Sequence, residues 1–172
     1  PESLPIIKKG KATYPQSLNE LTPEGARRRR VAVIYGDGNN FGAISNYKLT
    51  RLPESIQWTR RVNLTAQAAT GLGLMGALAD FFTEENRTVI PFQILALGGE
   101  DISLFTSGEI GMEFAEQFLR LTDMEFTPGA SEPEGRLSFS LGVLVTDEKS
   151  PVWRSIEFVE KDLLPSAKRA VK

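Results

Sequence analysis

Three carboxylates in this sequence stand where they could hold a metal ion together. Glu100 and Asp101 follow the pair Gly98-Gly99 in the stretch LALGGEDISLF. Asp37 ends an apolar, β-branched run, VAVIYGD. Carboxylates a few ångströms apart resist joint ionisation, and a divalent cation removes that conflict. Ligands that are all oxygens suit Mg²⁺ or Mn²⁺ rather than Zn²⁺, and two such ions can activate an attacking hydroxyl and neutralise a leaving pyrophosphate.

The same residues also fit an ordinary polar hairpin, since a Gly-Gly pair followed by acidic residues is a common turn. Asp37 favours the interpretation as a metal site. It ends a strand whose continuous apolar run predicts burial on both faces, where a charge needs a counter-charge. The residues alone leave both interpretations open.

The composition excludes several kinds of catalytic site. The chain has 172 residues, a net charge of −2, no histidine and no cysteine. A Ser-His-Asp triad and a zinc site with imidazole ligands are therefore excluded within this chain, so catalysis would rest on carboxylates, hydroxyls, lysine, arginine and hard metals. No disulfide framework, signal peptide or membrane-spanning run is visible, and we expect a cytoplasmic protein with no membrane partner.

The elements around these residues alternate between strands and helices. Four stretches have strand patterns, either a continuous apolar run or strict alternation: 31–37, 88–97, 101–106 and 137–145. Three stretches have apolar residues at spacings of three and four, which predict helices: 53–82, 111–121 and the segment after Ser150-Pro151. We expect Pro165 to break or kink the last of these.

The expected buried faces follow from the same spacings. On the long helix they are Trp58, Val62, Ala66, Ala69, Leu72, Met75, Ala79 and Phe82, and on the later helices Met112, Ala115, Phe118, Leu119, Ile156, Val159 and Leu163. Gly71, Gly73 and Gly76 interrupt the long helix, since each costs about 1 kcal/mol relative to alanine. They indicate either two helices or a close packing contact.

The order of elements predicts an α+β sandwich of the ferredoxin-like kind, βαββαβ, with additional helices. In that fold the first strand and the hairpin lie side by side at the centre of the sheet, so Asp37 would meet Glu100 and Asp101. Residues 1–29 contain four prolines and no sustained periodicity, and we predict a leader or linker there, followed by one domain over 30–172.

Four stretches, in order and at similar intervals, resemble the signature stretches of a known family, the palm domain in the large subunit of type III CRISPR effector complexes. They are YGDGNNFG at 35–42, LALGGEDISLF at 95–105, LSFSLGVLV at 137–145 and LLPSAKRAVK at 163–172. That palm is related to GGDEF diguanylate cyclases and to class III nucleotidyl cyclases such as adenylyl cyclase. The likeness covers about residues 30–172.

The resemblance implies a nucleotidyltransferase palm that binds ATP, or another nucleoside triphosphate, with two Mg²⁺ or Mn²⁺ ions. Such a palm makes a cyclic oligonucleotide or dinucleotide second messenger, cyclic oligoadenylate in that family, for CRISPR-related antiviral signalling. The resemblance also implies a composite site completed by a second palm domain or by a homodimer partner. Other CRISPR effector subunits and RNA would be partners of the full protein.

Carried onto this sequence, the resemblance makes Asp37, Glu100 and Asp101 the catalytic residues and, with the Gly38 carbonyl, the metal ligands. Lys168 would reach nucleotide phosphates, unless it is an ordinary solvated lysine near a helix end. The complete set of predicted nucleotide-binding residues is Gly38, Asn39, Asn40, Phe41, Gly42, Gly98, Gly99 and Lys168.

Two positions depart from the family pattern. Asn39 replaces a frequent aspartate, which would weaken a second metal site but could hydrogen-bond a base or ribose, and GGED replaces GGDD. Two alternatives stay open. One is a diguanylate cyclase of the GGDEF family, with Asn46 as its guanine contact. The other is a catalytically degenerate palm that senses nucleotide or acts as a scaffold in a ribonucleoprotein; Asn39 favours it, whereas the intact carboxylates count against it.

Overall fold

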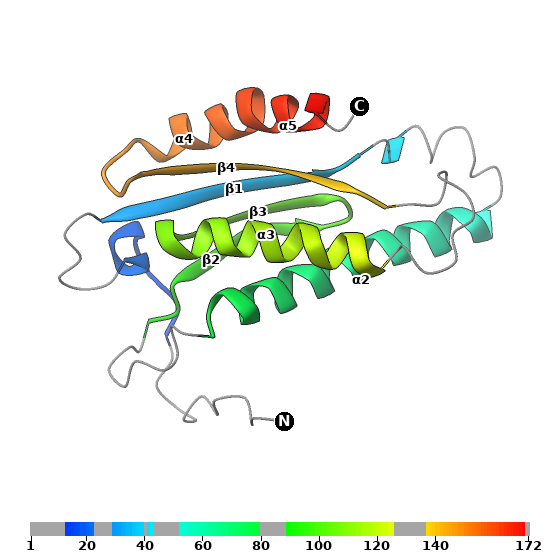
Figure 1. Ribbon diagram of the computed structural model, residues 1–172, viewed down its shortest axis with the longest axis horizontal. Helices are drawn as coiled ribbons and strands as arrows, with labels where there is room; N and C mark the ends of the chain where they lie inside the picture. Colours follow the sequence, from blue (N-terminus) through cyan, green and yellow to red (C-terminus); the bar gives the residue numbers. More distant parts are fainter. Residues whose placement is uncertain are drawn as a thin grey trace.

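A four-stranded antiparallel sheet, in the order β2-β3-β1-β4, forms the middle layer of the computed structural model (Figure 1). The strands are β1 (Arg30–Gly38), β2 (Phe92–Gly98), β3 (Asp101–Ser107) and β4 (Phe139–Asp147). With α2 (Leu52–Ala77) and α3 (Gly108–Glu125) they follow the order βαββαβ, which confirms the predicted fold class. The structure describes residues 13–22, 29–39, 41–42, 52–79, 89–125 and 137–170.

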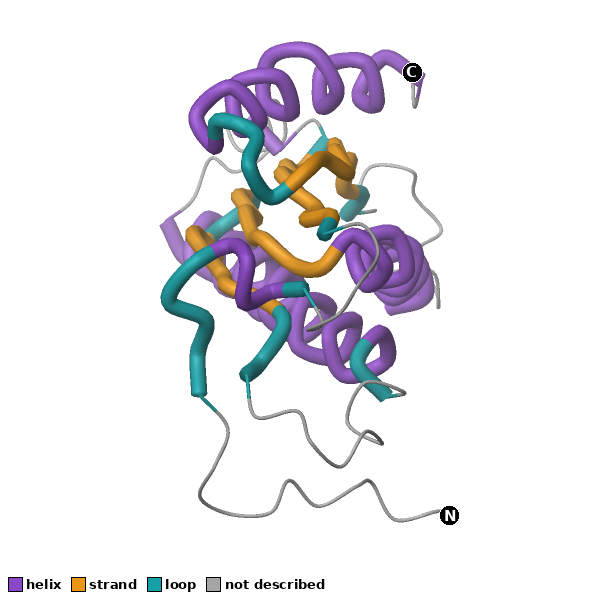
Figure 2. Tube along the Cα trace, turned by 90° about the vertical axis from the view of Figure 1, so that its left-hand side faces the viewer, coloured by secondary structure: helices purple, strands orange, loops and turns teal. Residues whose placement is uncertain are grey.

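Helices cover both faces of the sheet (Figure 2). On one face α2 and α3 pack over the larger hydrophobic core. On the other face a continuous C-terminal helix packs over β1 and β4, above the smaller core. Its three parts are α4 (Val152–Phe158), the π-helical segment η4 (Val159–Leu163) and α5 (Leu164–Ala170). This last layer is the helical addition that the sequence predicted.

Strand β1 is central because it has apolar residues for both layers. Ala32 and Ile34 belong to the core beneath α2 and α3, whereas Val31 and Val33 belong to the core beneath the C-terminal helix. Full burial of such an aliphatic side chain contributes roughly 1.5–3 kcal/mol. The prediction of a strand buried on both faces is confirmed, and β1 carries Asp37 at its carboxyl end.

Helix α2 is a single helix despite its glycines, but its buried face differs from the prediction in its second half. Leu72 and Met75 are 53% and 52% exposed, while Gly73, Leu74 and Ala77 are buried. A Cβ built on Gly73 would lie 3.4 Å from the ring of Phe114 in α3, so α3 approaches α2 at this glycine. The glycine therefore marks a close packing contact, one of the two predicted possibilities. The helix also ends at Ala77, before the predicted 82, and Phe82 lies outside the described residues.

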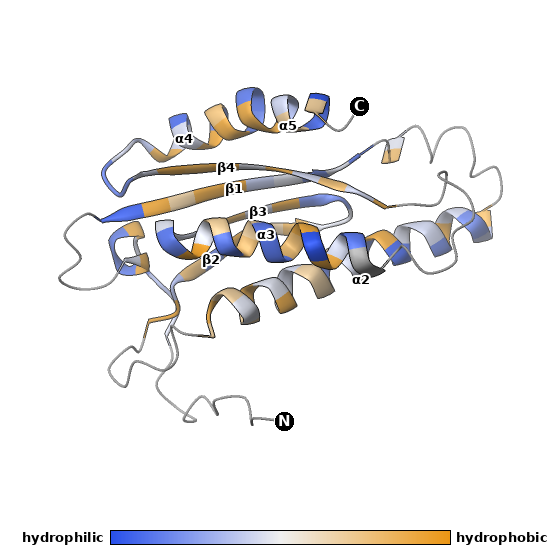
Figure 3. Ribbon diagram, viewed as in Figure 1, coloured by the Kyte–Doolittle hydropathy of each residue, from blue (hydrophilic) through white to orange (hydrophobic). Residues whose placement is uncertain are grey.

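Helix α3 is longer than the predicted 111–121, and two of its expected core residues are exposed. Met112 and Leu119 are 60% and 38% exposed, whereas Phe114 and Phe118 are fully buried. The face that packs is set by Ile110, Phe114 and Phe118, at a spacing of four, whereas the predicted face was counted from Met112 and is therefore rotated about the helix axis. Figure 3 shows apolar and polar residues alternating along the helices.

The hairpin forms as predicted between β2 and β3, but only β3 is buried. β2 begins at Phe92, after Pro91, rather than at 88, and it is an edge strand in which Ile94 and Leu95 are 39% and 45% exposed. Because an edge strand has one open side, its apolar run does not indicate burial on both faces. A bulge between Ile94 and Ala96 interrupts its pairing with β3.

Pro165 does not break the last helix, so that part of the prediction is wrong, but a π-helical segment in place of regular α-helix lies just before it. The π-helical turn before it lets the Leu164 N–H donate to the Val159 carbonyl, and the helix continues to Ala170. Proline tolerates this position because the wider turn re-forms the hydrogen bonds around the donor that proline lacks. The continuation carries Lys168 over the sheet.

Part of the segment predicted as a leader packs on the domain. The 3₁₀ turn Leu18–Leu21 buries Leu21 against Val31, Val33 and Phe105. The boundary at residue 30 stays a prediction. Among the helices of the described ranges, none combines the length and apolarity that crossing a membrane requires.

Candidate active site

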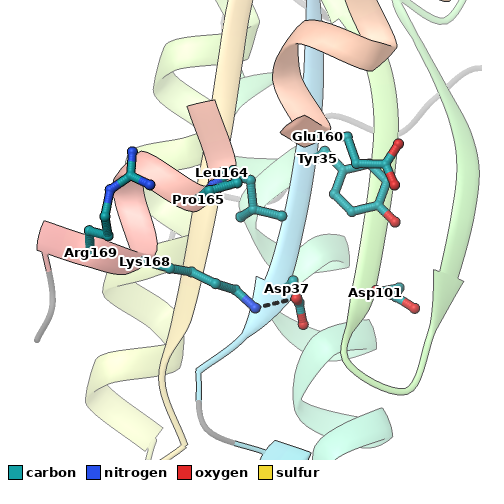
Figure 4. A pocket seen from close by; sticks show the side chains of 8 residues that line it. All are labelled: Tyr35, Asp37, Asp101, Glu160, Leu164, Pro165, Lys168 and Arg169. Carbon is teal, nitrogen blue, oxygen red and sulfur yellow. Dashed lines mark hydrogen bonds and ion pairs between the residues drawn. The ribbon is translucent and has the colours of Figure 1, made fainter. Parts of the chain in front are cut away.

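The register of the two central strands sets Asp37 opposite Asp101. Pairing between β1 and β3 runs from Val31 with Ser107 to Gly36 with Ile102, and the two aspartates are the next residue on each strand, so they lie on neighbouring strands where the pairing ends. Both side chains point to the side of the sheet that α5 covers (Figure 4). The expected meeting of the first strand with the hairpin therefore occurs through these two carboxylates.

Glu100 occupies the turn between β2 and β3, directly after Gly99, whose φ of 60° favours glycine. Burial raises the pKa of the Glu100 carboxyl above its ordinary value, and the charges of Asp37 and Asp101 raise it further. Burial, followed by the charge of Asp37, also raises the pKa of Asp101. The acidic side chains at this end of the sheet therefore oppose one another's ionisation.

Lys168 supplies the counter-charge. Its ammonium group contacts the carboxylate of Asp37 and also donates a hydrogen bond to the Gly38 carbonyl at 3.3 Å. It is thus not a freely solvated lysine, because its side chain is only 33% exposed. One cationic group thus reaches two of the four groups that the resemblance assigned to metal ions, Asp37 and the Gly38 carbonyl.

Asn39 is held by the start of β4. Its Nδ2 donates to Ser138 Oγ at 3.2 Å, its Oδ1 accepts from Ser140 Oγ at 2.8 Å, and its backbone N–H donates to the Ser138 carbonyl at 2.8 Å. The amide that was expected to replace a metal ligand or to contact a nucleotide thus has partners within the protein. It joins the end of β1 to β4.

Phe41 lies in the core. Its ring packs edge-on against Trp58 and Phe139, with ring centroids 5.6 and 5.4 Å apart. A Cβ built on Gly38 would lie 2.4 Å from that ring, so only glycine fits where β1 ends. The phenylalanine therefore packs beneath the end of β1, and its ring does not line the pocket.

The remaining glycines of the predicted site have open surroundings. A Cβ on Gly42, Gly98 or Gly99 would meet no atom within 4 Å, as expected if a ligand approaches there. Asn63 of α2, which the sequence analysis did not single out, accepts a hydrogen bond from the Gly99 N–H at 3.3 Å and so helps to fix the turn. Asn40 lies outside the described residues.

A pocket of about 450 Å³ opens between the C-terminal helix and the sheet (Figure 4). Its lining residues are Tyr35, Asp37, Asp101, Glu160, Leu164, Pro165, Lys168 and Arg169. Sequence reasoning missed Tyr35, Glu160 and Arg169. Because side chains alternate along a strand, Tyr35 lies on the same face as Asp37 and could have been predicted. The position of Glu160 depends on the π-helical turn, for which we know no sequence signal.

The oxygen atoms of this site suit a hard cation that takes its remaining ligands from outside the protein. Within the described ranges, no group of three or more acidic side chains is arranged to hold a metal ion. Asp37 and the Gly38 carbonyl are within reach of one cation, as Lys168 demonstrates, and Asp101 faces Asp37. Mg²⁺ usually takes only one or two carboxylates and completes its shell with water and phosphate oxygens.

No protein-family model and no curated protein matches the sequence. Several solved structures do match it. The crystal structure of the apo Csm1-Csm4 cassette matches 89% of this chain with a TM-score of 0.66 at 17% identity. The cassette in complex with pppApA matches 89% with a TM-score of 0.67 at 17% identity. This likeness establishes the fold.

The matched assemblies are of the class that the resemblance named. The Csm1-Csm4 subcomplex in the type III-A CRISPR-Csm interference complex matches 84% of this chain with a TM-score of 0.64 at 17% identity. Further structures of the cassette contain AMPPNP, one ATP, cA3 or cA4. The present chain spans about a fifth of the length of the chains it matches, 20% to 21% in these structures.

Proposed function

We propose that this chain is a metal-dependent nucleotidyltransferase palm. It binds ATP, or another nucleoside triphosphate, beside Asp37 and Asp101 and joins nucleotides into a cyclic oligonucleotide or dinucleotide. The observation that carries the proposal is the pair of facing carboxylates at the ends of β1 and β3, beneath Lys168, in a pocket of about 450 Å³. Ligand pockets commonly have volumes of about 300–1,000 Å³.

The proposed reaction is a displacement at phosphorus. The 3′-oxygen of an acceptor ribose attacks the α-phosphorus of a triphosphate, a P–O bond forms, and the bond to pyrophosphate breaks. Mg²⁺ or Mn²⁺, held by Asp37, Asp101 and the Gly38 carbonyl, would neutralise the charge that develops on the phosphates. Glu100, in the turn directly before Asp101, would accept the proton of the attacking hydroxyl, and burial raises the pKa of its carboxyl. Lys168, in the same pocket, offers a positive charge to the triphosphate.

The expected partners belong to the same proposal. Solved structures with this fold are parts of a CRISPR-Csm complex, which supports other effector subunits as partners of the full protein. We also propose that a second palm, or a second copy of this chain, completes the site, because transfer requires a donor and an acceptor nucleotide. RNA binding, antiviral signalling and a cytoplasmic location remain part of the proposal.

A second candidate is a palm that binds nucleotide without catalysis. It is favoured by Asn39, whose amide groups are bound to Ser138 and Ser140 and whose position would hold a second metal ligand in an active relative. The diguanylate cyclase alternative gains no support, since Asn46, its expected guanine contact, lies outside the described residues.

Product analysis separates these functions. The 172-residue chain is incubated with each of the four ribonucleoside triphosphates and Mn²⁺, and the products are resolved by chromatography and mass spectrometry. We expect cyclic adenylates from ATP and none from a Glu100→Gln variant. Cyclic di-GMP would support the diguanylate cyclase, and Mn²⁺-dependent binding without product in a dimeric sample would support the non-catalytic palm. Absence of nucleotide binding would contradict the proposal.

A further inference from the structure

The two walls of the pocket differ in charge. Lys168 and Arg169 of α5 form one wall, and Tyr35, Glu160 and Asp101 form the other (Figure 4). A ligand that contacts both walls must be anionic at one end and must carry hydrogen-bond donors at the other. A nucleoside triphosphate has this polarity, because its phosphates are acceptors and its ribose hydroxyls are donors.

Glu160 holds its place in this wall without an ionic partner. Among the described residues, none forms a salt bridge with Glu160, whereas its neighbour Lys161 pairs with Glu157 at 2.8 Å. The buried residues Val159 and Leu164, 0% and 5% exposed, fix the helix against the sheet on either side of Glu160. The carboxylate is thus carried by a rigid element and remains available to a ligand.

The chemistry of Glu160 limits what it can bind. An ionised carboxylate only accepts hydrogen bonds, so it repels the phosphates and attracts a hydroxyl or an amino group. Glu160, Tyr35 and Asp101 line the same wall of the pocket (Figure 4). Burial raises the pKa of both Asp101 and Tyr35, and the charge of Glu160 adds to both shifts. A ribose held at a metal ion on Asp101 would present its hydroxyls to this wall, and the hydroxyl next to the attacking 3′-hydroxyl is the 2′-hydroxyl.

We propose that Glu160 is a specificity-determining residue that accepts a hydrogen bond from the 2′-hydroxyl of the ribose at Asp101, and so selects ribonucleotides over 2′-deoxyribonucleotides. This inference rests on the proposed nucleotide-binding function and adds the class of sugar to it. The same wall would reject a ligand that offers no donor, because the carboxylate would then lose water without gaining a partner.

Calorimetric binding of ATP and of 2′-deoxy-ATP, each with Mn²⁺, tests the inference on the 172-residue chain. A hydrogen bond to a charged acceptor corresponds to a preference of about tenfold or more, so the wild-type chain should bind ATP at least tenfold more tightly than 2′-deoxy-ATP. Glu160→Ala should bind the two equally. Glu157→Ala, on the solvent side of the same helix, should keep the wild-type ratio, and circular dichroism verifies that each variant is folded.

Three results would overturn the inference. Glu160→Ala could keep the wild-type preference, or it could lose affinity for both nucleotides by the same factor. Third, the wild type could prefer ATP to purine riboside triphosphate, which lacks the 6-amino group, and Glu160→Ala could lose that preference while it still prefers ATP to 2′-deoxy-ATP. Glu160 would then contact the base and not the ribose. A wild-type chain that binds neither nucleotide would instead contradict the proposed function itself.

Discussion

Lys168 of α5 contacts the carboxylate of Asp37 at the end of β1, across 131 residues of sequence. The same ammonium group donates to the Gly38 carbonyl. In this arrangement a side chain provides the positive charge that a metal-nucleotide complex would otherwise provide. The contact ties the C-terminal helix to the site, and under the proposed function the same lysine also meets the triphosphate.

Replacement of Lys168 by methionine should lower the free energy of unfolding by about 1 kcal/mol, since Asp37 loses its counter-charge while solvent still screens the site. The variant should also bind ATP with Mn²⁺ more weakly, because the triphosphate loses a positive charge. Urea unfolding and calorimetry measure the two effects. The control is Lys161→Met, which removes an exposed pair with Glu157. Equal stabilities of the two variants would contradict the structural role of Lys168.

Asp101→Asn should stabilise the fold at neutral pH. The pKa of Asp101 is raised in the folded state, so ionisation of this carboxyl opposes folding above the folded-state pKa and has no effect below the unfolded-state pKa. The gain should therefore be largest at neutral pH and disappear in acid. Urea unfolding over a pH series measures it, with Glu113→Gln on the exposed face of α3 as the control. A gain that is independent of pH would refute this account of the repulsion.

Asn39→Ala should destabilise the fold by about 1–3 kcal/mol, because the buried hydroxyl of Ser140 loses its acceptor. Asn39→Asp keeps an acceptor for Ser140 and should cost less. Thermal or urea unfolding compares the two variants. If Asn39→Ala is as stable as the wild type, the amide does not join β1 to β4 in solution, and its role as a nucleotide contact regains support.

Two glycine substitutions should have opposite effects. A Cβ on Gly111 would lie 2.3 Å from the Cβ of Ala32, so Gly111→Ala should force α3 off β1 and cost about 1–3 kcal/mol. Gly71, on the exposed side of α2, has no atom within 4 Å of a built Cβ, so Gly71→Ala should stabilise by up to about 1 kcal/mol. Urea unfolding of both variants decides whether the close packing of α3 on β1 is correct.

The sequence was sufficient for features that depend on local pattern. The apolar run that ends at Asp37 predicts a central strand, and the Gly98-Gly99 pair predicts the hairpin, so the meeting of the first strand with the hairpin follows from topology. The exposed Leu72 and the buried Gly73 could not be distinguished, because the phase of an apolar helix depends on where the neighbouring helix approaches.

Other features depend on contacts between distant parts of the chain. The hydrogen-bond partners of Asn39 are Ser138, directly before β4, and Ser140, within β4, about a hundred residues further along. The position of Glu160 depends on a π-helical turn that accommodates Pro165. Neither arises from a local propensity, and both alter the chemistry assigned to the site.

The central claim is that Asp37 and Asp101 bind a metal-nucleotide complex. Its most direct test is calorimetric binding of ATP, with and without Mn²⁺, to the wild-type chain and to Asp37→Asn and Asp101→Asn variants that circular dichroism shows to be folded. We predict Mn²⁺-dependent binding by the wild type and a loss of at least about tenfold in each variant, the equivalent of 1.4 kcal/mol. Binding that is independent of Mn²⁺, or unchanged in both variants, would contradict the claim.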